Sequence, residues 1–115
     1  MNSVNQTDRI WTIVIADDVP IVRLGLRRIV ESVSEFRLVG EAENGRQAID
    51  MVRSLSPELL LLDLDMPEIS GMEVMEALTP EMQSLKIAIL TGSTETKDVL
   101  NSFERGARGV IAKDV

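Results

Sequence analysis

The sequence contains no cysteine, no histidine and no tyrosine, and its aromatic residues are two phenylalanines and one tryptophan. The absence of cysteine excludes disulfide scaffolds, thiol nucleophiles and thiolate metal sites. The absence of histidine excludes imidazole bases and most zinc sites. Any chemistry must therefore use carboxylates, hydroxyls, lysine or a metal ion.

Long apolar runs are also missing: none approaches the roughly 20 residues that a membrane-spanning helix needs. Residues 1–8 are polar and lack the pattern of a signal peptide, so we expect a polar leader, no membrane contact and a cytoplasmic location. The net charge of -7 argues against direct contact with nucleic acid, which needs clustered Lys and Arg. We expect this 115-residue single domain to bind a cation or a basic partner.

Short apolar runs alternate with segments of helical period, and this alternation predicts a parallel sheet with helices on both faces, the doubly wound α/β class. The predicted strands are residues 13–16, 38–39, 59–62, 87–90 and 110–112. The helical faces between them are Val22, Leu26, Ile29, Val30 and Val33 after Pro20; Ala48, Val52 and Leu55; Val74 and Leu78 after Ser70-Gly71; and Val99, Leu100 and Phe103 after Ser93-Thr94. The short second and fifth runs predict edge strands, the long third run predicts a central one, and Gly106 suits a left-handed helix end.

A functional group follows four of the predicted strands. The four-leucine run ends at Asp63, and the other groups are Asp17 and Asp18, Thr91, and Lys113. Parallel strands all point the same way, so these groups should converge at one edge of the sheet, where open α/β sheets bind ligands. Taken singly, each has a structural explanation: a cap or turn for the acids, a structural hydroxyl for the threonine and a solvated charge for the lysine.

Such a cluster would have a definite chemistry. Neighbouring carboxylates repel one another unless a cation neutralises them, and ligands that are all oxygens favour Mg²⁺. A lysine and a hydroxyl at the same edge would meet the charge of a phosphoryl group. A carboxylate nucleophile would complete the site by forming an aspartyl phosphate.

From Thr12 to Lys113 the chain resembles the receiver domain of bacterial two-component response regulators, which has the CheY-like fold with strand order 2-1-3-4-5. The resemblance rests on four motifs in order: residues 15–18 (IADD), residues 62–67 (LDLDMP) with Gly71, residues 90–92 (LTG) and residues 106–114 (GARGVIAKD). The last two, with residues 29–31 and 40–42, are most similar to the NarL/LuxR-type branch.

The resemblance implies a role for each residue. Asp63 would be the phosphoacceptor, with Thr91 and Lys113 contacting the phosphoryl group. Asp18 would bind Mg²⁺ directly, Asp17 through water, and Asp65 through its backbone carbonyl. The phosphoryl donor would be a sensor histidine kinase or a small molecule such as acetyl phosphate. A receiver domain of this kind is a phosphorylated switch and not a turnover enzyme.

The chain departs from the family pattern in two ways. Val110 stands where the family usually has an aromatic side chain that couples to the threonine, and the family's fifth helix and this branch's DNA-binding output domain have no counterpart in the sequence. We therefore expect residues 9–115 to form a receiver domain without its final helix. An apolar strip beside the last strands should then be open or covered by a second copy in a homodimer.

Two alternatives remain open at this stage. A haloacid dehalogenase-like phosphatase also uses an aspartate nucleophile, and Asp63 and Asp65 resemble its motif, but there the nucleophile comes first in the chain and the paired acids last. A receiver that serves only as a docking or dimerisation module keeps the fold without the chemistry. The complete set of acids, threonine and lysine argues against that reading.

Overall fold

A computed structural model of the chain describes residues 9–92 and 104–113. Five parallel strands form one sheet in the order β2-β1-β3-β4-β5. The strands are β1 (Trp11–Ala16), β2 (Phe36–Ala42), β3 (Leu59–Asp63), β4 (Lys86–Thr91) and β5 (Gly109–Ala112). The doubly wound class, the edge positions of the second and fifth strands and the central position of the third are therefore confirmed.

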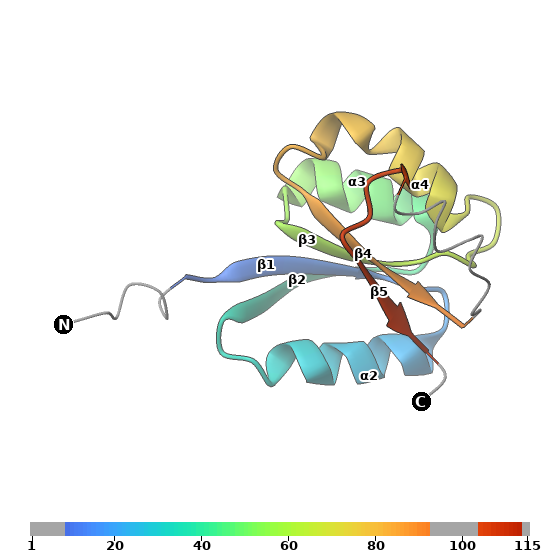
Figure 1. Ribbon diagram of the computed structural model, residues 1–115. Helices are drawn as coiled ribbons and strands as arrows, with labels where there is room; N and C mark the ends of the chain where they lie inside the picture. Colours follow the sequence, from blue (N-terminus) through green and yellow to red (C-terminus); the bar gives the residue numbers. More distant parts are fainter. Residues whose placement is uncertain (1–8, 93–103, 114–115) are drawn as a thin grey trace.

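In the described part of the chain three helices cover the sheet, with α2 (Pro20–Glu31) on one face and both α3 (Gly45–Leu55) and α4 (Gly71–Ala77) on the other (Figure 1). A short 3-10 turn, η1 (Thr79–Glu81), follows α4. None of the helices in the described part of the chain is long and apolar enough to cross a membrane. The helix predicted after Ser93 lies outside the described residues.

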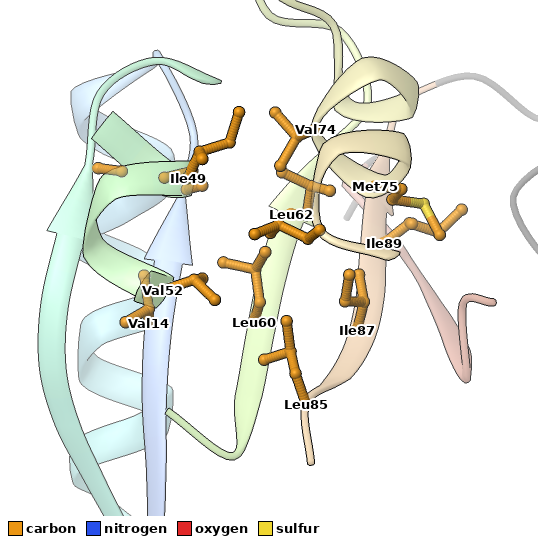
Figure 2. Close-up of a cluster of buried hydrophobic side chains, with 14 of the residues drawn as sticks. Val14, Ile49, Val52, Leu60, Leu62, Val74, Met75, Leu85, Ile87 and Ile89 are labelled. Atoms are coloured by element: carbon orange, nitrogen blue, oxygen red, sulfur yellow. The ribbon is translucent and has the colours of Figure 1, made fainter. Parts of the chain in front are cut away.

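The larger part of the core lies between the sheet and helices α3 and α4. Leu60 and Leu62 of β3 are inaccessible to solvent, and they meet Val52 of α3 and Val74 of α4 in this layer (Figure 2). A smaller cluster fills the α2 face, where Val30 is the buried residue of the helix. Beside it runs an open apolar groove of about 320 Å³, lined by residues that include Leu26, Ile29 and Ile111.

Local signals explain where the helices begin. Pro20 lies at the first position of α2, where its missing N–H costs nothing. Ser70 and Glu73 form a capping box at the start of α4, with each side chain accepting a hydrogen bond from the other residue's backbone N–H. Gly106 has a φ of +108°, which confirms the left-handed position predicted for it.

The structure corrects some of the predicted limits and burials. β2 spans seven residues and not only 38–39, because an edge strand with one solvated face does not show a continuous apolar run. Ile29 was assigned to the buried face of α2 but is 63% exposed, since it borders the open groove. Val33 lies beyond the helix, which ends at Glu31.

Candidate functional site

Three carboxylates meet at the carboxyl edge of the sheet. Asp17 directly follows β1 and Asp63 is the last residue of β3, and these strands are paired in register so that Ala16 lies beside Leu62. Asp17 is 0% exposed and Asp63 is 1% exposed, whereas Asp18 is half-buried. One oxygen of each of the three carboxylates lies within 4.8 Å of the others. The topology thus brings acids together that are more than 40 residues apart along the chain.

The backbone holds Asp17 rigidly in this cluster. Its N–H donates to the carbonyl of Ala42 at the end of β2, at 3.1 Å. Its Oδ1 accepts a hydrogen bond from the backbone N–H of Val19 at 2.9 Å, which closes the turn into α2. The remaining oxygen, Oδ2, therefore points to the interior of the site, where it meets Lys113.

Lys113 bridges two of the acids. Its Nζ lies 2.8 Å from Oδ2 of Asp17 and 3.1 Å from Oδ1 of Asp63. Burial by itself lowers the pKa of Lys113, but the hydrogen bonds and charges of the two carboxylates outweigh it, so its pKa is raised above the usual value. The backbone N–H of Lys113 donates to the carbonyl of Thr91 at 3.0 Å and fixes the lysine beside β4. The ammonium is thus held charged at the centre of the cluster.

Asp63 is stabilised on one oxygen only. Its Oδ1 accepts from the backbone N–H of Asp65 at 3.0 Å and pairs with Lys113, whereas Oδ2 is buried with no hydrogen-bond partner among the described residues. Burial raises the pKa of Asp63, the charge of Asp17 adds to this, and the contacts from Asp65 and Lys113 only partly oppose it. The carboxylate is therefore poorly solvated and still needs a positive or hydrogen-bonding partner.

Thr91 and Asp65 occupy the same edge. Thr91 ends β4, the strand next to β3, and is 5% exposed. Asp65 is exposed, and its backbone N–H is the part that contacts Asp63. The loop then returns to Gly71, where an added Cβ would stand 2.5 Å from the carbonyl oxygen of Asp63, so only glycine fits against this strand end.

The donor set fits Mg²⁺. All the ligand atoms offered by Asp17, Asp18 and Asp63 are carboxylate oxygens, which hard divalent cations prefer. Oδ2 of Asp63 is a buried atom with no hydrogen-bond partner in the described ranges, and a cation would satisfy it. The acidic cluster therefore has the ligand chemistry of a Mg²⁺ site.

Sequence reasoning missed one residue that touches this site. The guanidinium Nη1 of Arg23 donates to the backbone carbonyl of Asp17 at 2.6 Å. The available signal was a basic residue in the first turn of α2, where the helix dipole favours acids.

Comparison with known proteins decides the family. Residues 13–115 match the family profile of the response regulator receiver domain. The chain belongs to this family. Among the receiver's relatives are the nitrate/nitrite response regulator protein NarL of Escherichia coli strain K12, with 38% identity over 104 residues, and the transcriptional regulatory protein YdfI of Bacillus subtilis strain 168, with 37% identity over 102 residues. The matches cover 90% and 89% of this chain but only 48% and 47% of those proteins, so the receiver spans about half the length of these relatives.

Solved receiver structures agree with this fold. The signal receiver domain of the putative response regulator NarL from Mycobacterium tuberculosis superposes with a TM-score of 0.87 at 27% identity, covering 93% of this chain and 86% of that one. The isolated receiver domain of RcsB from Salmonella enterica serovar Typhimurium, solved with the phosphomimetic BeF3-, gives a TM-score of 0.85 at 26% identity, covering 93% and 80%. The predicted NarL/LuxR-type receiver with a CheY-like fold is confirmed, and the phosphatase alternative is set aside.

Proposed function

We propose that this receiver domain accepts a phosphoryl group on Asp63 from a phosphohistidine of a sensor histidine kinase. The observation that carries the proposal is the state of Asp63: it is buried, paired with Lys113 through Oδ1, and without a hydrogen-bond partner at Oδ2 among the described residues. A buried carboxylate with one free oxygen at the ligand-binding edge of a parallel sheet is suited to act as a nucleophile. Small donors such as acetyl phosphate would serve the same site.

The acids would hold one Mg²⁺ ion, with Asp18 and Asp63 as direct carboxylate ligands, Asp17 acting through water and the backbone carbonyl of Asp65 as a further ligand. The three carboxylates are close enough together to share one ion. When bound, the ion would offset the repulsion among them and neutralise charge on the phosphoryl oxygens.

In the transfer step an oxygen of Asp63 forms a bond to phosphorus as the bond from phosphorus to the imidazole nitrogen breaks. The nitrogen leaves with the electron pair of that bond and takes up one proton from solvent, so the products are an aspartyl phosphate and a neutral histidine. Lys113 orients Asp63 and balances the charge of the phosphoryl oxygens. The hydroxyl of Thr91 donates a hydrogen bond to one of them.

The result of phosphorylation would be regulatory. The relatives named above are about twice as long as this chain and include a transcriptional regulatory protein, so we infer that the receiver controls a DNA-binding output domain and does not itself contact DNA. The partner classes are the kinase and a second copy in a homodimer, in the cytoplasm. The domain takes up one phosphoryl group per cycle and does not turn over a free substrate.

Incubation with acetyl phosphate and Mg²⁺, followed by intact mass measurement, tests the proposal. We expect one phosphoryl group on the wild-type chain and none on Asp63→Asn. Asp50→Asn, which removes an exposed acid on α3, is the matched control and should be phosphorylated like the wild type. An adduct that persists in Asp63→Asn, or no adduct on the wild type with either acetyl phosphate or a phosphorylated kinase, contradicts the proposal.

A further inference from the structure

Arg23 is a cation in a place where helix energetics do not favour one. It lies in the first turn of α2, which contains no acidic residue, and its side chain is only 14% exposed. The helix dipole places partial positive charge at this end, so an arginine here is opposed by the helix itself. In this nearly buried position the guanidinium charge must be stabilised by contacts outside the helix.

Those contacts lead to the acidic cluster. Nη1 of Arg23 donates to the carbonyl oxygen of Asp17 at 2.6 Å, a short charge-assisted hydrogen bond. Nε lies 3.7 Å from Oε1 of Glu41 on β2. Glu41 is itself held by Arg27, which donates to both of its carboxylate oxygens at 2.6 and 2.9 Å. Arg23 thus joins the backbone at Asp17 to an anchored ion-pair network on the edge strand.

The bond to the carbonyl of Asp17 fixes two acids at once. This carbonyl belongs to the planar peptide unit that joins Asp17 to Asp18, and the preceding peptide unit is already held by the bond from the N–H of Asp17 to Ala42. With both units pinned, the direction in which the side chain of Asp17 leaves the backbone is set. The unit after Asp18 is held by the bond from the N–H of Val19 to Oδ1 of Asp17, so the side-chain direction of Asp18 is set by this unit together with the one that Arg23 holds. The guanidinium of Arg23 thus acts on the peptide unit shared by two of the three acids of the cluster.

We propose that Arg23 is a positioning residue for the divalent-cation site, acting through the peptide unit between Asp17 and Asp18. The inference rests on the proposed function, because it assumes that these acids hold a cation. Residues behind the ligands typically change metal affinity 10–100-fold when they are replaced. Arg23 contacts the backbone of Asp17 and no ligand carboxylate, so we expect an effect near the lower end of this range.

Two simpler roles give different results. If Arg23 acted only by its charge, its removal would strengthen the binding of a cation, which is the opposite sign. If it served only to tie α2 to β2, Arg27→Met would have the same effect, because Arg27 makes the stronger contact with the same Glu41. Arg27 has no contact with Asp17 among the described hydrogen bonds, so it is the matched control.

The experiment is a titration of the metal-free protein with Mn²⁺, followed by electron paramagnetic resonance of the free ion and by competition with Mg²⁺. We expect Arg23→Met to weaken binding of both ions about tenfold. Arg27→Met should change the affinity by less than about twofold, since the partly exposed Arg27 contacts Glu41 and not the metal ligands. Equal losses in the two variants, unchanged binding in Arg23→Met, or tighter binding in Arg23→Met would each overturn the inference.

Circular dichroism and urea unfolding first establish that each variant is folded. If Arg23→Met does not fold, Arg23→Gln replaces it. A neutral polar side chain tolerates this nearly buried position and is too short to keep the bond to Asp17, and the same tenfold loss is expected. The titration is independent of phosphorylation. A wild-type chain that binds Mn²⁺ but accepts no phosphoryl group would contradict the proposed function and would not contradict this inference. A wild-type chain that binds no divalent cation would overturn the inference.

Discussion

Two regions of strand β3 show opposite relations between burial and stability. Leu60 and Asp63 lie three residues apart and are equally inaccessible, at 0% and 1% exposure. Leu60 is surrounded by the apolar side chains of β4, α3 and α4 (Figure 2), whereas Asp63 faces a second buried acid and one lysine. Burial stabilises the first and raises the proton affinity of the second. The strand therefore contributes stability along most of its length and gives some of it up at its last residue, where the site lies.

The largest effect should come from the apolar part of the strand. Leu60→Ala leaves a cavity in the layer under α3 and α4, and we expect the free energy of unfolding to fall by roughly 2–5 kcal/mol. Leu55→Ala is the matched control: this leucine at the end of α3 is 46% exposed, so its truncation should cost about 1 kcal/mol or less. Urea unfolding measures both, and equal losses would mean that the layer is not the stabilising core.

The acidic end of the strand should respond in the opposite direction. In metal-free buffer at neutral pH, we expect Asp63→Asn to raise the midpoint of urea unfolding, because an amide of the same shape carries no buried charge and Lys113 keeps Asp17 as its partner at 2.8 Å. The gain should be smaller than the loss in Leu60→Ala. Asp50→Asn, on the surface of α3, should leave the midpoint unchanged.

Added Mg²⁺ sharpens this contrast. An ion that binds the folded state only should stabilise the wild type more than Asp63→Asn, so the difference between them should shrink as Mg²⁺ is added. A lower midpoint in metal-free Asp63→Asn would show that its contacts with Lys113 and Asp65 outweigh the cost of burial.

The sequence predicts the strands and the place of the site, but not the side-chain contacts within the site. Apolar runs and the rule that parallel strands share a direction are local and topological signals, and they predicted that Asp17, Asp63, Thr91 and Lys113 would lie at one edge of the sheet. The lysine bridge between Asp17 and Asp63 depends on side-chain direction, which no sequence period specifies.

Arg23 and Glu41, which support the site from outside, also escaped prediction, and the reason is related. The contact of Arg23 with Asp17 needs the entry angle of α2, and its contact with Glu41 needs the register in which β2 lies beside β1. β2 was itself predicted too short, because Arg37 and Gly40 flank its two-residue apolar run. Glu41 lies outside that run, so its place on the edge strand beside α2 was not predicted either.

The smallest expected change in stability comes from replacing Glu41. This replacement tests whether a carboxylate charge near the carboxyl edge of the sheet always destabilises the fold. The hydrogen bond from Arg27 lowers the pKa of Glu41 despite its partial burial, so its ionised form stabilises the fold. That contribution is fully present above the unfolded-state pKa, at about 4.3, and is lost as the pH falls through the lower folded-state pKa. We therefore expect Glu41→Gln to lower the urea midpoint slightly at pH 7.

This deficit should disappear in acid, and it should shrink at about 1 M salt, since the ion pair is partly exposed to solvent. Glu43→Gln, an exposed acid two residues further along the chain, should show no such dependence. A deficit in Glu41→Gln that stays constant with pH would mean that the side chain acts by packing and not by charge. A deficit that follows the predicted sign would show that the carboxylate paired with arginine stabilises the fold, in contrast to Asp63, whose pKa is raised by burial.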